Sequence, residues 1–437
     1  GAVNINTITS ITAAGATTTA AILANDAQVT HDTDFTVVFA AGTATDAELT
    51  AINTATGGTQ DASLITAITA ADATTTAALI ADGTVTLKGD VLITTSTTSA
   101  TMAELKAINT GTTGFVNAVS VTGITAGTVA DATGVLITNQ GTSGNKIDTL
   151  ASVGVVLSGD TTVTATALAA LNAATTGHLD ASAAIDTITA GSTAQFKLIQ
   201  VTNQAETGDA VQTAADVNVT FSAVETATDA DLTAIMTSTT GTTNINSITS
   251  ITAAGATTTA AIMAGTTHDN DITVVFVAGT ATDAELTAIN TATGGTQDAS
   301  LITAITAADA TTTAALIADG TVTLKGDVLI TTSTTSATMA ELKAINTGTT
   351  GFVNAVSVTG ITAGTVADAT GVLITNQGTS GDKIDTLASV NVVLSTDTTV
   401  TATALAALDA ATTGHLDASA AIANITAGST AQFKLIQ

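Results

Sequence analysis

Residues 101–114 read Thr-Met-Ala-Glu-Leu-Lys-Ala-Ile-Asn-Thr-Gly-Thr-Thr-Gly, and this stretch decides the fold. Thr101 followed three residues later by Glu104 is the pattern of a capping box, in which two side chains close the first turn of a helix. Leu105 and Ile108 lie on one side of that helix and form a narrow apolar stripe. The stretch therefore predicts a short, capped helix that buries one edge.

Six further copies of this segment occur along the chain, and the shared leucine recurs every 54 to 64 residues. The same capping pair is present at Thr45/Glu48, Thr282/Glu285 and Thr338/Glu341. One copy has Ala167 in place of the glutamate, so we expect its helix to be capped less well. A glycine 12 or 13 residues after each threonine suits a left-handed position at the helix end or the turn beyond it. These glycines are Gly57, Gly114, Gly177, Gly241, Gly294, Gly351 and Gly414.

Segments rich in β-branched residues lie between the predicted helices and indicate strands. One kind begins Ile-Thr-x-Ile-Thr-Ala or a close variant, at Ile8, Ile65, Val121 and Ile185. A small-residue stretch such as 73–80 follows it and favours either a second short helix or a turn, because threonine is a poor helix former. Another strand comes next, as in 35–39, 91–94, 155–158 and 217–221.

These elements divide the chain into fifteen half-units of about 29 residues. A half-unit with one strand and one short helix cannot bury its own apolar face, whereas stacked half-units share a continuous core. We therefore predict a repeat solenoid, with parallel β-strands stacked in coils of about 29 residues and with short capped helices. The absence of proline agrees with this fold, because each level of a stack needs its backbone N–H donors.

A much longer repeat is superimposed on the short one. Residues 41–200 match residues 278–437 with six differences. We therefore divide the chain into a first large unit of about eight coils, 1–240, and a second, incomplete unit, 241–437. The second copy stops in mid-unit and residue 1 is glycine, so we expect the sequence to be part of a longer array.

The composition excludes several classes of function. The chain has no Cys, and its formal net charge is −28. It therefore has no thiol nucleophile and no metal–thiolate site, and it is expected to be repelled by nucleic acid and by anionic membranes. Apolar residues make up 45% of the chain, which argues against an acidic disordered tail. No apolar run approaches the length of about 18 residues that a membrane helix needs.

Few residues suggest site chemistry. An Asp-rich loop with a histidine occurs at 31–34 and again at 268–271, and such a loop either holds a divalent cation or is a polar surface loop. We favour the surface loop. Asp90, Asp160 and Asp209 follow glycines, so they suit turns or weak surface calcium. We assign no catalytic, cofactor or metal residue and expect no enzymatic activity. The four lysines of each large unit are expected to pair locally with acids.

Residues 104–114, together with the alternating Ile-Thr-x-Ile-Thr-Ala strands, resemble the long Thr/Ala-rich repeat proteins of bacterial cell surfaces and secretions, of the cyanobacterial type in particular. Those proteins carry many Leu-Lys-Ala-Ile-Asn-x-Ala-Thr-x-Gly repeats. The resemblance implies an extracellular or cell-surface location and a structural role. It transfers no catalytic residue.

The favoured hypothesis is a structural extracellular protein, a rigid solenoid segment of a self-assembling filament, sheath or surface layer. Its main partner would be itself, in a homopolymer or a continuous repeat array, with polysaccharide or the cell surface as a further partner. One alternative is the stalk of an adhesin. Another is a binding module that docks ice or polysaccharide on threonine ladders such as Thr84-Val-Thr86 and Thr164-Ala-Thr166.

Overall fold

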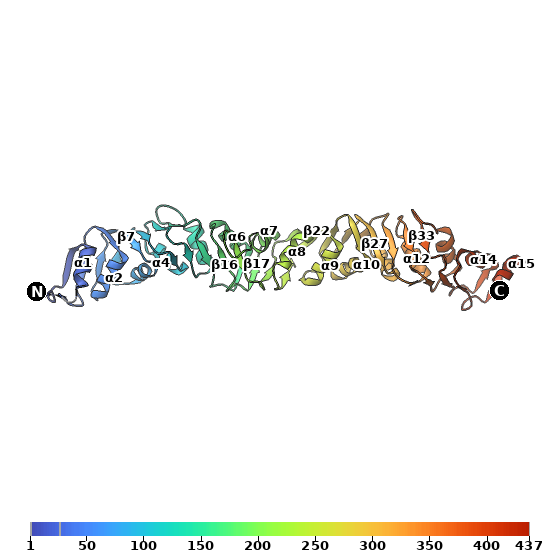
Figure 1. Cartoon of the computed structure of the whole chain (residues 1–437), viewed down its shortest axis with the longest axis horizontal. Helices are drawn as coiled ribbons and strands as arrows, with labels where there is room; N and C mark the ends of the chain where they lie inside the picture. The colour runs from blue at the N-terminus through green and yellow to red at the C-terminus, as the bar shows by residue number, and fades with distance from the viewer. Residues whose placement is uncertain (1, 26–27, 437) are drawn as a thin grey trace. The chain divides into compact units, whose positions relative to one another are not determined.

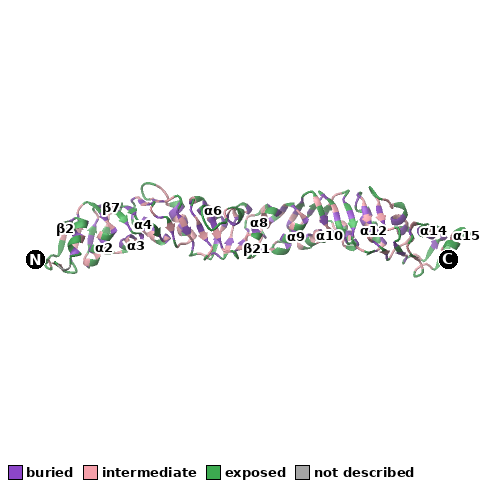
Figure 2. Ribbon diagram, viewed as in Figure 1, coloured by how far each residue is buried: buried purple, intermediate pink, exposed green. Residues whose placement is uncertain are grey.

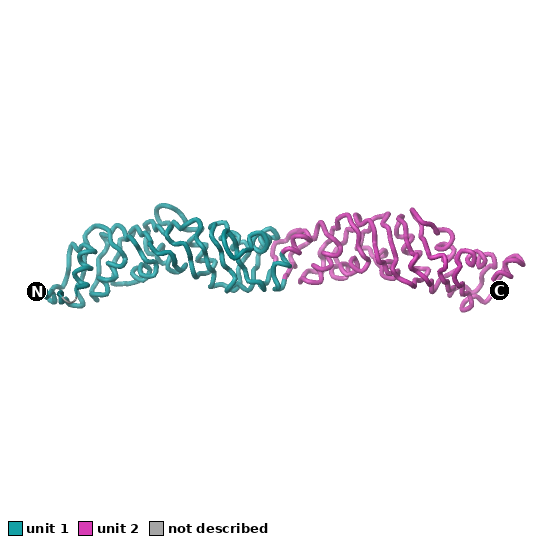
Figure 3. Tube along the Cα trace, viewed as in Figure 1, with its two compact units in different colours: residues 1–220, 235–242 teal, residues 221–234, 243–437 magenta. Residues whose placement is uncertain are grey.

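The computed structural model describes residues 2–25 and 28–436 and separates into two compact units. Unit 1 contains the residues up to 220 together with 235–242, and unit 2 contains 221–234 and the residues from 243 onward (Figure 3). Within each unit short parallel strands alternate with short helices, and each turn of the chain stacks on the one before (Figure 1). The predicted fold class, a repeat solenoid of parallel strands and short capped helices, is confirmed.

Each coil, defined as one α-helix and the strands that lead to the next, has a helix of one of two kinds. Successive helices start 27 to 30 residues apart, or 36 apart where a loop is inserted. The seven copies of the Thr-x-Ala-Glu-Leu segment form α2 (Asp46–Ala55), α4 (Met102–Gly111), α6 (Ala165–Ala174), α8 (Asp229–Thr237), α10 (Asp283–Ala292), α12 (Met339–Thr347) and α14 (Ala402–Ala411).

The small-residue stretches, for which the sequence allowed either a helix or a turn, are helices. They are α1 (Ala16–Leu23), α3 (Ala73–Ala81), α5 (Val129–Thr133), α7 (Thr193–Lys197), α9 (Ala256–Gly265), α11 (Ala310–Ala318), α13 (Val366–Thr370) and α15 (Thr430–Leu435). Three of them continue into π-helical turns, which are η1 (Gly134–Thr138), η2 (Leu198–Thr202) and η3 (Gly371–Thr375).

The predicted capping boxes are present. In α4 the Thr101 hydroxyl accepts from the Glu104 N–H, and the Glu104 carboxylate accepts from the Thr101 N–H. The same reciprocal pair closes α2, α10 and α12. At α6 the Thr164 hydroxyl caps Ala167 N–H without a return bond, as the alanine at that position predicts.

The coils carry alternately two and three strands, so the prediction of one strand per coil is wrong. Many of these strands have only two or three residues, too short for an alternating pattern to reveal. In unit 1 the strands are β1 (Val3–Asn4) with β3 (Val29–Thr30); β2 (Ser10–Ala14), β4 (Thr36–Phe39), β6 (Gln60–Ala62) and β8 (Val85–Leu87); β5 (Gly42–Thr45), β7 (Ile65–Ala71), β9 (Leu92–Thr95), β11 (Val116–Ala118) and β13 (Ile147–Thr149); β10 (Ser99–Ala100), β12 (Gly123–Ile124), β14 (Gly154–Val156), β16 (Leu179–Ala181) and β18 (Val211–Thr213); and β15 (Thr162–Thr164), β17 (Thr187–Thr189) and β19 (Asn218–Thr220).

Unit 2 repeats the pattern, and each strand again pairs in parallel with the next but one in the chain. Its strands are β21 (Thr243–Asn244) with β23 (Thr266–Thr267); β20 (Glu225–Thr228), β22 (Ile248–Ala254), β24 (Thr273–Phe276), β26 (Gln297–Ala299) and β28 (Val322–Leu324); β25 (Gly279–Thr282), β27 (Ile302–Ala308), β29 (Leu329–Thr332), β31 (Val353–Ala355) and β33 (Ile384–Thr386); β30 (Ser336–Ala337), β32 (Gly360–Ile361), β34 (Asn391–Val393) and β36 (Leu416–Asp417); and β35 (Thr399–Thr401) with β37 (Asn424–Thr426).

From coil to coil, the paired strand residues lie progressively further in sequence from the helix that follows them. In the sheet from β5 to β13 the paired residues are Ala44, Ile68, Ile93, Val116 and Ile147. The first lies two residues before α2, whereas the last lies eighteen before α6. Paired strands are about 4.8 Å apart but packed helices need about 8–10 Å. This shift adds a displacement along the strand direction to the distance between paired strands. Successive helices are therefore spaced widely enough to pack.

The core is a row of inward side chains from successive strands and helices. Ile68, Ile93, Val116 and Ile147 are fully buried, as is Leu105 from α4. Buried segments recur along both units (purple in Figure 2). Small alanines and threonines fill the remaining positions, so each coil is thin and adjacent backbones come close. This close approach determines which contacts join the coils.

A bulge with left-handed backbone ends several strands just before the next helix. Ala70 in β7 has φ 50° and Ala307 in β27 has φ 52°, where a side chain with a Cβ costs about 1–2 kcal/mol. We expect Ala70→Gly to stabilise unit 1 by about 0.5 kcal/mol, because relief of this strain exceeds the added entropy of the unfolded chain. The control Ala67→Gly, in the regular part of β7, should lower the urea midpoint. An equal loss from both would contradict the prediction.

Candidate functional site

A threonine two residues before a glycine joins every second coil to the one before it. The Thr112 hydroxyl donates to the Val91 carbonyl at 2.7 Å and accepts from Gly114 N–H at 2.8 Å. We call this pair of bonds the Thr–Gly clasp. It follows all seven helices of the first kind, with Thr–carbonyl distances of 2.5–2.7 Å. The threonines are Thr56, Thr112, Thr175, Thr239, Thr293, Thr349 and Thr412.

The glycine of the clasp is required by close approach and not by a left-handed backbone. None of the seven predicted glycines has positive φ, so the left-handed assignment is wrong. A Cβ built on Gly114 would lie 2.4 Å from the Val91 carbonyl oxygen in the preceding coil. In two copies the clasp glycine is Gly58 or Gly295, one residue after the predicted glycine.

Loss of one clasp hydroxyl should weaken one interface between coils. Thr112→Val keeps the shape of the side chain but leaves the Gly114 N–H and the Val91 carbonyl without this partner. Thr112 is 3% exposed, so we expect a loss of about 2–4 kcal/mol in the free energy of unfolding. The exposed neighbour Thr113→Val is the control, and it should cost less than about 1 kcal/mol. Urea unfolding of both variants measures the difference.

The third residue of several helices makes a second contact between coils. The Glu104 carboxylate, which closes its own capping box, also accepts a 2.6 Å bond from Thr74 of α3 in the preceding coil. Glu285 and Glu341 accept from Thr257 and Thr311 in the same way. In α7 and α15 a glutamine takes this position and lies 3.2 Å and 3.1 Å from a threonine of the preceding helix.

These contacts lower the pKa values of the glutamates. Partial burial acts to raise the pKa of Glu104, but the bonds from Thr101 and Thr74 outweigh it and hold the pKa below its usual value. The balance is the same for Glu341 and Glu285. The ionised form is therefore the one that joins the coils.

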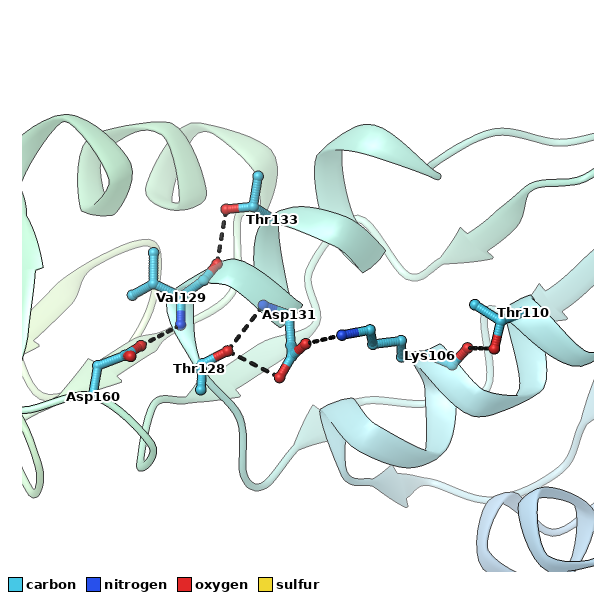
Figure 4. A network of polar contacts seen from close by, with 7 residues as sticks. All are labelled: Lys106, Thr110, Thr128, Val129, Asp131, Thr133 and Asp160. Carbon is cyan, nitrogen blue, oxygen red and sulfur yellow. Dashed lines mark hydrogen bonds and ion pairs between the residues drawn. The ribbon is translucent and has the colours of Figure 1, made fainter. Parts of the chain in front are cut away.

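α5 uses a charged version of this contact (Figure 4). Asp131 forms a 2.5 Å ion pair with Lys106 of the preceding coil and accepts from Thr128, its own N-cap. Asp160, further along the same coil, accepts from Val129 N–H at 2.6 Å. The Lys106 bond and then the Thr128 bond lower the pKa of Asp131. The predicted local pairing of lysines is present here and between Lys88 and Asp90.

Within the described residues, neither candidate cation loop belongs to a cluster of metal-ligating side chains. His31 contacts the Phe35 ring edge-on, and its Nδ1 lies 2.9 Å from the Asp32 carbonyl oxygen. His268 faces the carbonyl oxygens of Asp269 and Met263 at 3.1 Å. Over residues 2–25 and 28–436, no three His, Asp or Glu side chains gather as metal ligands.

The aspartates that follow glycines have different surroundings. Asp90 pairs with Lys88 and Asp160 caps α5, whereas Asp209 lies exposed in the loop after η2. Two of the three therefore make structural contacts.

The outward threonines do not form long ladders in the sheets where pairing is described. Thr162 pairs with Thr187, but the next strand brings Asn218 to that row. The row that starts at Thr43 continues with Ala67 and Leu92. Neither of these two rows therefore presents the long run of identical threonines that a surface matching a crystal lattice needs.

None of the helices in the described part of the chain has the length and apolarity needed to span a bilayer. No family model, curated protein or solved structure matches this chain.

Proposed function

We propose that the protein is a structural segment of an extracellular filament, sheath or surface layer, and that its coils continue from unit to unit. The observation that carries the proposal is the Thr–Gly clasp, which recurs with nearly constant geometry after every helix of the first kind in the described residues. At every second coil a threonine finds the same carbonyl acceptor in the coil before it. The number of units would then set the length of the assembly.

The surface chemistry supports this role. With 36 acidic residues against 8 lysines, the surface stays hydrated and resists collapse onto its neighbours. Glu104, Asp131 and Glu341, whose pKa values are lowered, are engaged in capping and in contacts between coils. The partner that these features favour is another stretch of the same repeat.

Electron microscopy of the source cells with antibodies against residues 88–197 tests the proposal. We expect label along filaments or a continuous layer outside the cell. Label confined to the cell interior, or to separate particles, would contradict it. Label only at the base of a projection with a different protein at its tip would instead favour the adhesin stalk.

A further inference from the structure

A polar hollow of about 550 Å³ lies beside the loop that follows η2 in unit 1. This volume falls in the range of about 300–1,000 Å³ that small-ligand sites occupy. Its polar wall is formed by Ser182, Gln204, Glu206, Gln212, Thr213 and Ser238. The residues come from three successive coils, including the loop after η2, so the fold itself brings them together.

A buried amide lies behind this wall. Gln200 is 1% exposed, and its Oε1 lies 3.3 Å from the Thr213 hydroxyl and 3.5 Å from the Ser238 hydroxyl, both of which line the hollow. Its Nε2 is buried and has no hydrogen-bond partner. An unpaired buried donor destabilises the folded state. Gln200 does not itself line the hollow, and rotation of its amide would aim this donor at the Thr213 and Ser238 hydroxyls, which do.

The sister coil of α5 shows that the fold does not need this amide. Residues 129–140 and 193–204 form the same short helix, π-helical turn and loop, and both end in Thr-Asn-Gln. The position of Gln200 is held there by Leu136, which is 4% exposed. A buried leucine at this position packs without an orphan donor. Gln200 is therefore less favourable for stability than the leucine of the sister coil.

Other differences between the two coils converge on the same hollow. Relative to the sister coil, Ser182 stands where Val119 is, Glu206 where Thr142 is, and Ser238 where Ala174 is. Each of these three residues is more polar than its apolar or neutral counterpart, and all three residues line the hollow. Three such differences in the lining, with Gln200 behind it, indicate a built site.

We propose that this hollow binds an uncharged sugar residue of a glycan. Sugar hydroxyls both donate and accept, so one ring can accept from the Gln212 amide and donate to the Glu206 carboxylate, while Gln200 orients the Thr213 and Ser238 hydroxyls from behind. Ser182, Thr213 and Ser238 supply further hydroxyls that serve in either role. An anionic ligand is disfavoured, because Glu206 faces the hollow and the chain carries a net charge of −28. This proposal stands independently of the filament.

Saturation-transfer NMR on the whole chain, with neutral tetrasaccharides of β-glucose, α-glucose and N-acetylglucosamine at millimolar concentration, tests the site. We expect transfer to at least one of them, and at least a tenfold loss in Gln200→Leu and in Glu206→Thr. Both variants install the residue of the sister coil. Ser143→Ala, at the exposed tip of the sister loop, is the matched control and should bind as the parent does.

The stability of Gln200→Leu separates binding from misfolding. Removal of an orphan donor should leave the urea midpoint unchanged or raise it, even though binding is lost. The proposal is overturned if no neutral tetrasaccharide binds, if Gln200→Leu binds as well as the parent, or if an oligogalacturonate binds more tightly than every neutral sugar.

Discussion

Gly114→Val is expected to open the contact between two coils and to cost more than about 4 kcal/mol in the free energy of unfolding. A side chain at this position would place its Cβ 2.4 Å from the Val91 carbonyl oxygen and 2.5 Å from that of Asp90. Those are backbone atoms of the preceding coil and cannot turn aside. The two coils must separate, which also breaks the clasp at Thr112.

Hydrogen exchange followed by mass spectrometry would locate this opening, because faster exchange should be confined to the peptides that cover residues 85–118. Gly134→Ala is the matched control. No heavy atom lies within 4 Å of a Cβ built on Gly134, which has ordinary helical φ of −58°. This control should be neutral or stabilise the protein by up to about 1 kcal/mol. Equal damage from both substitutions would contradict the close-approach argument.

Acidification is expected to weaken every coil that is joined through a glutamate. The pKa values of Glu48, Glu104, Glu285 and Glu341 are lowered in the folded chain, where burial is outweighed by bonds from threonines. Their contribution to stability is therefore complete above the unfolded value of about 4.3 and is lost as the pH falls through the lower folded values. These sites lie in both units. The loss in thermal midpoint below pH 4 should therefore exceed the loss caused by any of the single-site substitutions above.

Repulsion within a chain of net charge −28 opposes this trend, since protonation relieves it. Moderate salt screens the repulsion between exposed charges more than the hydrogen bonds. The measurement therefore compares thermal midpoints from pH 6 to pH 2 in 0.5 M salt, on the order of a 4 Å Debye length. A double variant, Glu104→Gln with Glu341→Gln, should have a flatter profile, as glutamine already occupies this position in α7 and α15. An unchanged profile would show that these glutamates are not responsible.

The helices with strong local signals could be predicted from the sequence. Thr101 and Glu104 act within one turn, so neither needs the rest of the fold to be interpreted. The helix at Ala73–Ala81 was ambiguous, because three successive threonines lower its intrinsic propensity. It forms because Asp72 caps it and the adjacent coils bury Ala73, Thr76 and Leu79.

The strand count and the π-helical turns could not be predicted. Strands of two or three residues such as β8 and β12 have no readable period, and only their partners in the next coil define them. The π-helical turn at Gly134–Thr138 continues a sequence that reads as an ordinary helix. In both cases the deciding contacts lie outside the segment.

The clasp glycines were found for the wrong reason, and the clasp threonine was missed. The spacing from Thr101 to Gly114 is regular, but sequence alone does not distinguish a left-handed turn from a close approach to another coil. The hollow near Gln200 was also missed. The alignment of 129–140 with 193–204 carried its signal, since a glutamine replaces a leucine that the repeat otherwise buries.

The contacts that join the coils have a consequence for folding kinetics. The clasp and the strand pairs link residues separated by 21 to 32 positions in the chain, whatever their place in either unit. Folding slows when native contacts span long stretches of sequence, because long loops must close first. Added units of this kind bring only more contacts of the same short span. Lengthening the gene by whole repeats should therefore leave the search time per coil nearly constant, so growth in size need not carry a penalty in folding speed.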